Sequence, residues 1–360
     1  MSSSPQGLPL GPLRRYLADH LPEARGPVTA TLVPGGRSNL TYLLTDGHSR
    51  WILRRPPLGG LTPSAHDVGR EYRVVAALHG TDVPVARPVL WCEDSTVIGA
   101  PFTVVEYVPG VVIRARRDLE GYDDQTVARC ARALVDTLAR LHAVPYAEVG
   151  LGAFGRPQGY LRRQVRRWYD QWRRVATREL PDIDALHTRL ADAVPPESAA
   201  SIVHGDYRID NTILDEDDIA TVRAVVDWEM ATIGDPLADL GLHLVYRDPA
   251  FEPVLPGSAA SASARMPSAD ELAERYARVS GRDLDRLGYY LALGYFKIAV
   301  IAEGIHARHL AGLTVGEGFD TVGTAVPELA AGGLRALRRG TVDGAGNRRS
   351  TGRADRSRGR

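Results

Sequence analysis

The sequence predicts an α+β protein with two lobes, in which a small antiparallel-sheet lobe precedes a mainly helical lobe. The first observation is that short runs of β-forming residues, separated by turn residues, fill roughly the first 108 positions around one helical segment. The second is that apolar residues recur mostly at helical spacing beyond that point. A chain of 360 residues is long enough for one large two-lobed domain.

The sheet lobe is expected at residues 1–108 and opens with a helix inside the first 25 positions. The turn-rich segment 34–39 and the pair Asp46-Gly47 separate the first three strands from one another. Strands are expected at 28–33, 40–44, 51–53, 85–91 and 102–106, with a helix at 64–79.

The helical lobe is expected at residues 109–339. Helical spacing is clear at 126–142 and 160–174, and helices resume from about 237. Two short apolar runs, 201–203 and 222–226, interrupt this pattern and enclose a polar loop. Residues 340–360 are rich in glycine and arginine and are expected to be a disordered tail.

Composition excludes several classes of protein. Lysine plus arginine and aspartate plus glutamate both number 44, so the net charge is zero, which argues against a dedicated nucleic-acid binder. Cys92 and Cys130 lack metal-site spacing and indicate incidental thiols of a cytosolic protein. Residues 1–12 do not resemble a secretion signal. The most apolar segment, 287–302, is too short for a comfortable membrane span and contains Lys297, the only lysine. We therefore expect a cytoplasmic protein with no nucleic-acid or membrane partner.

One segment carries the chemistry. It reads His204-Gly205-Asp206-Tyr207-Arg208-Ile209-Asp210-Asn211, and Asp227-Trp228-Glu229 begins sixteen residues later. Phosphoryl transfer from ATP needs positioning and charge neutralisation more than covalent help. Asp206 would orient an acceptor hydroxyl and take its proton, while Asn211 and Asp227 would hold Mg²⁺ with hard oxygen ligands.

This pattern resembles the signature of aminoglycoside phosphotransferases and their relatives, which share the protein-kinase fold. The resemblance implies ATP and Mg²⁺ as cofactors and covers roughly residues 25–330. His204 is expected to order the loop through hydrogen bonds. The resemblance implies that Asp235 and Asp239 brace the loop and cap the next helix. The role of Glu229 stays open, since this position can lie near the metal in the family.

The same resemblance assigns the upstream residues to nucleotide binding. Gly36, Arg37 and Ser38 would form a lid over the phosphates, where glycine allows backbone N–H groups to approach closely. Kinases place a phosphate-binding lysine where this chain has Arg54 or Arg55, and a guanidinium can also fork onto phosphate oxygens. Glu71 would pair with that arginine. Backbone groups from Glu106 to Val108 would contact adenine.

Within the family, the chain is most similar to phosphotransferase domains fused to, or encoded beside, acyl-CoA dehydrogenases. The similar segments are 150–152, 160–168, 296–301 and 304–305. This branch implies an acceptor hydroxyl on an acyl-CoA chain.

Three functions remain open. The chain is a kinase for a hydroxyacyl-CoA or similar anionic small molecule, an antibiotic-inactivating O-phosphotransferase for an aminoglycoside, nucleoside or macrolide, or a non-catalytic kinase-like binding module. The arginine-rich segment 160–174 suits phosphates better than a polycationic aminoglycoside, although a solvated helix would carry the same charges. The presence of Asp206, Asn211 and Asp227 together disfavours the non-catalytic module. The oligomeric state stays open.

Overall fold

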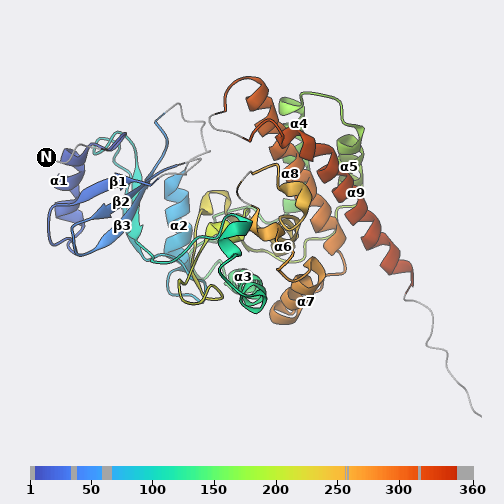
Figure 1. Ribbon diagram of the computed structural model, residues 1–360, viewed down its shortest axis with the longest axis horizontal. Helices are drawn as coiled ribbons and strands as arrows, with labels where there is room; N and C mark the ends of the chain where they lie inside the picture. Colours follow the sequence, from blue (N-terminus) through green and yellow to red (C-terminus); the bar gives the residue numbers. More distant parts are fainter. Residues whose placement is uncertain are drawn as a thin grey trace, which may run out of the picture.

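A computed structural model describes residues 5–33, 39–58, 67–255, 257, 259–314 and 318–346, with side chains described as far as residue 338. It has two lobes, with the sheet at one end and the long helices at the other (Figure 1). The predicted α+β arrangement is confirmed.

The sheet lobe contains five antiparallel strands in the order β1-β2-β3-β5-β4. Its elements are α1 (Leu10–His20), β1 (Thr29–Leu32), β2 (Leu40–Thr45), β3 (Arg50–Arg55), α2 (Val68–Leu78), β4 (Pro88–Cys92) and β5 (Phe102–Glu106). One face of the sheet, which includes Trp51, Leu53 and Phe102, forms a core with the leucines of α1. The other face is therefore left for the helical lobe.

Helix α2 joins the two lobes. Asp67 caps it by accepting a hydrogen bond from the Arg70 N–H at 2.8 Å. Although α2 lies between β3 and β4 in the sequence, its buried Val74 and Leu78 belong to the core of the helical lobe. Figure 1 shows α2 between the sheet and the helices. Helix α2 also packs against β4 and β5, so it contacts both lobes.

The helical lobe is built around α8, a long apolar helix that packs against α4, α5, α6 and α9. Its helices are α3 (Asp124–Ala143), α4 (Tyr160–Val175), α5 (Pro181–Asp192), α6 (Pro236–Val245), α7 (Ala269–Ser280), α8 (Leu287–Leu310) and α9 (Val322–Gly346). Helix α9 thus extends past residue 340, where we expected the tail to begin. Within the described part of the chain, no helix combines the length and apolarity that crossing a membrane requires.

Two small two-stranded sheets are formed by the segment that lies between α5 and α6 in the sequence. They contain β6 (Ser201–Val203), β7 (Thr212–Leu214), β8 (Val222–Val225) and β9 (Thr232–Gly234). Strand β6 pairs with β9, and β7 pairs with β8. The two apolar runs seen in the sequence thus belong to different sheets, and the loops that contain Asp206, Asn211 and Asp227 connect these sheets.

Candidate active site

A cavity of about 320 Å³ lies between the lobes, against the face of the main sheet that α1 does not cover. The sheet lobe contributes Arg54 and apolar residues such as Ile52 and Val105 to its wall. The helical lobe contributes Asn211 and Asp227. The cavity therefore brings together the predicted phosphate-binding cation and both predicted metal ligands.

Asp206 lies in a tight turn that follows β6. Gly205 has φ +83°, and an added Cβ would lie 2.8 Å from the Met230 carbonyl oxygen, so a side chain there would be strained. The Asp239 carboxylate accepts hydrogen bonds from the N–H groups of His204 (2.5 Å) and Gly205 (2.8 Å). Asp239 thus braces the turn from α6.

His204 and Asp235 are also structural supports. The buried His204 ring accepts the Asp206 N–H at Nδ1 (3.3 Å), and its Nε2 lies 2.9 Å from the Val226 carbonyl oxygen. Asp235 caps α6 by accepting the Leu237 N–H at 3.0 Å. These contacts agree with the structural roles expected for His204 and Asp235 from the sequence.

The Asp206 carboxylate accepts a hydrogen bond on each oxygen. Asn211 Nδ2 donates to Oδ2 at 3.1 Å and to the Asp206 backbone carbonyl at 2.8 Å. The Tyr246 hydroxyl donates to Oδ1. Burial, together with the negative charge of Asp206, raises the pKa of Tyr246 well above its usual value, so it stays protonated at neutral pH. The Asp206 side chain is still 26% exposed, so solvent reaches it despite these contacts.

Asp227 has an unusual backbone. Its φ is +66°, and it is the only non-glycine residue with positive φ in the part of the chain that the structure describes. Such strain concentrates at functional sites, where surrounding contacts impose it. Asp227 follows β8 and lines the cavity with Asn211. Their oxygen donors suit Mg²⁺, which usually takes one or two carboxylates and completes its shell with water and phosphate. Among the described residues, no group of three or more His, Cys, Asp or Glu side chains is arranged to hold a metal ion.

Arg54, rather than Arg55, faces the cavity. Arg54 forms an ion pair with Glu71 of α2, and its Nη2 lies 3.3 Å from Asp227 Oδ1. Burial alone would lower the pKa of Arg54, but the charges of Glu71, Asp227 and Glu229 raise it above its usual value. Arg55 points to the α1 side and donates to the carbonyl oxygens of three residues, which are Gly7, Pro56 and Ile98. Successive strand residues face opposite sides, so only one of the two arginines can reach phosphates here.

The remaining predicted nucleotide contacts have mixed outcomes. Gly36, Arg37 and Ser38 lie outside the described residues. Glu106 and Val108 both line the cavity. The Glu106 N–H already donates to the Arg87 carbonyl (2.9 Å), and the Glu106 side chain pairs with Arg87. Any adenine contact at Glu106 must therefore use its carbonyl oxygen.

Three residues near Asp206 were not assigned a role from the sequence, namely Arg208, Tyr246 and Lys297. Arg208 Nη1 lies 2.7 Å from Asp210 Oδ2, and its Nε lies 3.6 Å from Asp206 Oδ2. Lys297 of α8 donates to the Gly205 carbonyl at 2.5 Å. The position of Arg208 inside the motif and the uniqueness of Lys297 were available signals, whereas nothing in the sequence pointed to Tyr246.

The arginines of α4 differ in their surroundings. Arg163 donates to the backbone carbonyls of Arg156 and Gln158, which fixes the loop before the helix. The Arg167 guanidinium lies 5.7 Å from the Trp168 ring centroid. Arg167 is also exposed on the surface of α4.

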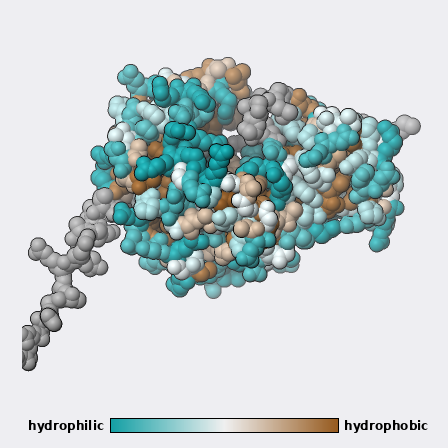
Figure 2. Space-filling view, turned by 180° about the vertical axis from the view of Figure 1, so that it is seen from behind, coloured by the Kyte–Doolittle hydropathy of each residue, from teal (hydrophilic) through white to brown (hydrophobic). Residues whose placement is uncertain are grey.

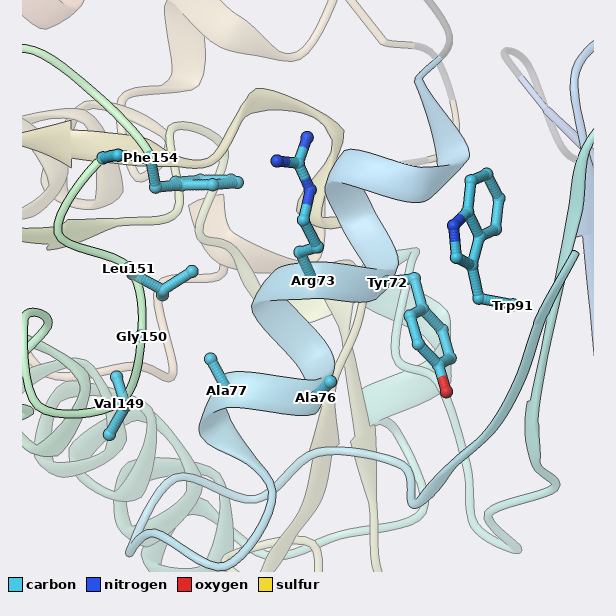
Figure 3. A pocket seen from close by; sticks show the side chains of 10 residues that line it. Tyr72, Arg73, Ala76, Ala77, Trp91, Val149, Gly150, Leu151 and Phe154 are labelled. Carbon is cyan, nitrogen blue, oxygen red and sulfur yellow. The ribbon is translucent and has the colours of Figure 1, made fainter. Parts of the chain in front are cut away.

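A second and larger cavity, of about 470 Å³, lies on another side of α2 (Figure 3). Its wall combines Tyr72, Arg73 and Ala76 of α2 with the loop that contains Leu151 and Phe154. It contains none of the motif residues, so size alone does not identify the functional site.

The surface opposite the view of Figure 1 is mostly hydrophilic, with hydrophobic residues scattered in small areas (Figure 2).

Comparison with known proteins agrees with these features. The profile of the phosphotransferase enzyme family matches residues 29–290. Acyl-CoA dehydrogenase family member 11 of Rattus norvegicus is 35% identical over 336 residues, which cover 91% of this chain and 43% of that protein. The chain thus spans less than half the length of this curated relative.

Solved structures resemble the whole two-lobed arrangement. A crystal structure from Ralstonia eutropha, assigned by name to the aminoglycoside phosphotransferases, has a TM-score of 0.79 at 30% identity and covers 92% of this chain and 99% of that chain. A thermostable aminoglycoside phosphotransferase in a ternary complex with AMP-PNP and hygromycin B has a TM-score of 0.58 at 16% identity, covering 90% and 98% of the two chains. The second likeness concerns the fold alone.

Proposed function

The chain belongs to the phosphotransferase enzyme family and has its kinase-like two-lobed fold, and on this premise we propose that it transfers the γ-phosphoryl group of ATP to a hydroxyl of a small molecule. The single observation that carries the proposal is that Asn211, Asp227 and Arg54 line one interlobe cavity, while Asp206 is hydrogen-bonded to Asn211 beside it. A non-catalytic module would have no need to keep all four.

The reaction follows from the positions of these groups. The acceptor oxygen attacks the γ-phosphorus, its proton passes to the Asp206 carboxylate, and the bond from phosphorus to the β-phosphate oxygen breaks to release ADP. Asn211 orients the Asp206 carboxylate and, with Asp227, would hold Mg²⁺, which supplies positive charge to the phosphate oxygens when bound. Arg54 binds phosphate oxygens while Glu71 fixes its direction.

For the acceptor, we infer a hydroxyl on an anionic metabolite of the hydroxyacyl-CoA kind. The named relative that supports this is an acyl-CoA dehydrogenase family member, of which this chain matches the phosphotransferase part. Arg167 and its neighbours on α4 would attract the phosphates of CoA and repel a polycation. An antibiotic acceptor is the second candidate, because a structural relative was solved with hygromycin B.

Asp206→Asn tests the chemistry. It keeps the side-chain shape but cannot take the proton, so kcat should fall by about 10²–10⁴-fold while ATP still binds. The assay is ADP release with a panel of hydroxyacyl-CoAs, free hydroxy acids and aminoglycosides, with ATP affinity measured by calorimetry. Full transfer activity in Asp206→Asn would refute the mechanism. Transfer to aminoglycosides alone would replace the first acceptor class by the second.

A further inference from the structure

Lys297 stands out in the composition of the chain. Lysine and arginine together number 44, and only this one is lysine. The chain uses arginine for its surface cations. A single lysine therefore suggests a position where a compact ammonium fits better than a planar guanidinium. Lys297 lies on α8 between the buried residues Phe296 and Ile298, where a cation is costly unless it has partners.

The partner of Lys297 is the catalytic turn. The Nζ atom donates to the Gly205 carbonyl at 2.5 Å, one residue before Asp206, and lies 5.4 Å from the Trp168 ring centroid. Burial lowers the pKa of Lys297, and the negative charges of Asp206 and Asp239 oppose this effect.

The turn is thereby held from two sides. Asp239 accepts the N–H groups of His204 and Gly205, and Lys297 binds the Gly205 carbonyl. Gly205 is in the left-handed region, where the direction of its carbonyl also sets the direction of the next residue. Without Lys297, one side of the turn loses its anchor while the other stays intact.

The shape of the site explains the choice of lysine. Trp168, which is 7% exposed, lies beside the ammonium, and Met230 packs against Gly205. An ammonium is compact and can turn its N–H groups to one carbonyl, whereas a guanidinium is planar and longer. An arginine would have to displace Trp168 or the turn itself.

We propose that Lys297 is a positioning residue for phosphoryl transfer, whose ammonium fixes the Gly205 carbonyl and so directs the Asp206 carboxylate at the acceptor hydroxyl. This inference rests on the proposed function. No described residue of α8 lines the nucleotide cavity. The inference nevertheless gives α8 a direct contact with the catalytic turn.

Lys297→Met and Lys297→Arg test the proposal in the full chain. Both keep an unbranched stem, and Arg308→Met, an exposed position on the same helix, is the matched control. With the best acceptor from the panel, Lys297→Met should lower kcat by about 10–100-fold, within the range of one lost orienting contact, and leave the Kd for ATP unchanged. Lys297→Arg should recover less than a tenth of the lost activity. Arg308→Met should match the wild type.

Amide hydrogen exchange gives a readout that does not depend on the acceptor. Exchange at Gly205 and Asp206 should be about 10-fold faster in Lys297→Met and unchanged in Arg308→Met. Wild-type kcat and exchange in Lys297→Met would overturn the proposal, and full activity in Lys297→Arg would overturn the need for a compact ammonium. If Lys297→Met does not fold, the kcat of Lys297→Arg and its amide hydrogen exchange at Gly205 and Asp206 test the proposal instead. If the wild type phosphorylates no hydroxyl, the proposed function fails, while exchange still shows whether Lys297 holds the turn.

Discussion

Glu71→Gln tests the link between α2 and the phosphate-binding cation. The Glu71 side chain is only 9% exposed and the Arg54 side chain 19%, so their ion pair is largely out of water. Glutamine keeps the size of the side chain and removes its charge. Arg54 would then be left with Asp227, at 3.3 Å, as its remaining partner in an ion pair.

The magnitude follows from the burial of the pair. Removing one member of a buried ion pair typically costs ~3–5 kcal/mol. Because Arg54 keeps Asp227, we expect the lower end, about 3 kcal/mol, which corresponds to a fall in Tm of roughly 4 °C for a chain of 360 residues. A loosened Arg54 would also lose most of one charge-assisted hydrogen bond to phosphate, so ATP affinity should fall about 10-fold.

Denaturant unfolding and calorimetric ATP titration measure the two effects. Arg73→Gln on the same helix is the control, because Arg73 is exposed, and its free energy of unfolding should change by less than ~0.5 kcal/mol. Replacing both Arg54 and Glu71 by methionine should restore much of the stability without restoring ATP affinity. If Glu71→Gln unfolds and binds ATP like the wild type, the pair does not organise the site as argued.

Three further outcomes are expected. Asp227→Asn should weaken Mg·ATP binding and recover part of its activity at high Mg²⁺, which kinetics at varied Mg²⁺ will show; no response to Mg²⁺ would exclude Asp227 as a ligand. Arg167→Gln should raise KM for a CoA ester several-fold and leave the Kd for ATP unchanged, and an equal KM would make α4 a plain surface helix. Burial lowers the pKa of His243 to about 4. The unfolded chain therefore binds the extra proton first, so stability is complete above pH ~6.5 and falls by up to about 3 kcal/mol as pH drops towards 4. Thermal unfolding of His243→Gln should lose less stability over that range, and parallel curves would contradict the assignment.

The sequence alone determined the local parts of this protein. The spacing from Asp206 to Asn211 and Asp227 was enough to propose a catalytic loop, because these residues are close along the chain and their proposed roles depend on residue type and order. Helical spacing predicted α3 within two residues at its start and one at its end, and α4 within one residue at its end, because a 3.6-residue period marks the buried face of a helix. The strands of the main sheet were likewise visible in composition and turn residues.

Only the tertiary structure decided which side chains meet. Arg54 and Arg55 are adjacent in the sequence and equivalent in charge, and their roles separate only because α1 covers one face of the sheet. Tyr246 reaches Asp206 across 40 positions, and Lys297 reaches Gly205 across 92. Such contacts depend on how α6 and α8 pack against the β6 turn, and packing is a property of the whole core rather than of any segment. A sequence pattern indicates the hydrophobic period of each helix or strand, but it does not determine the distance in space between two of them.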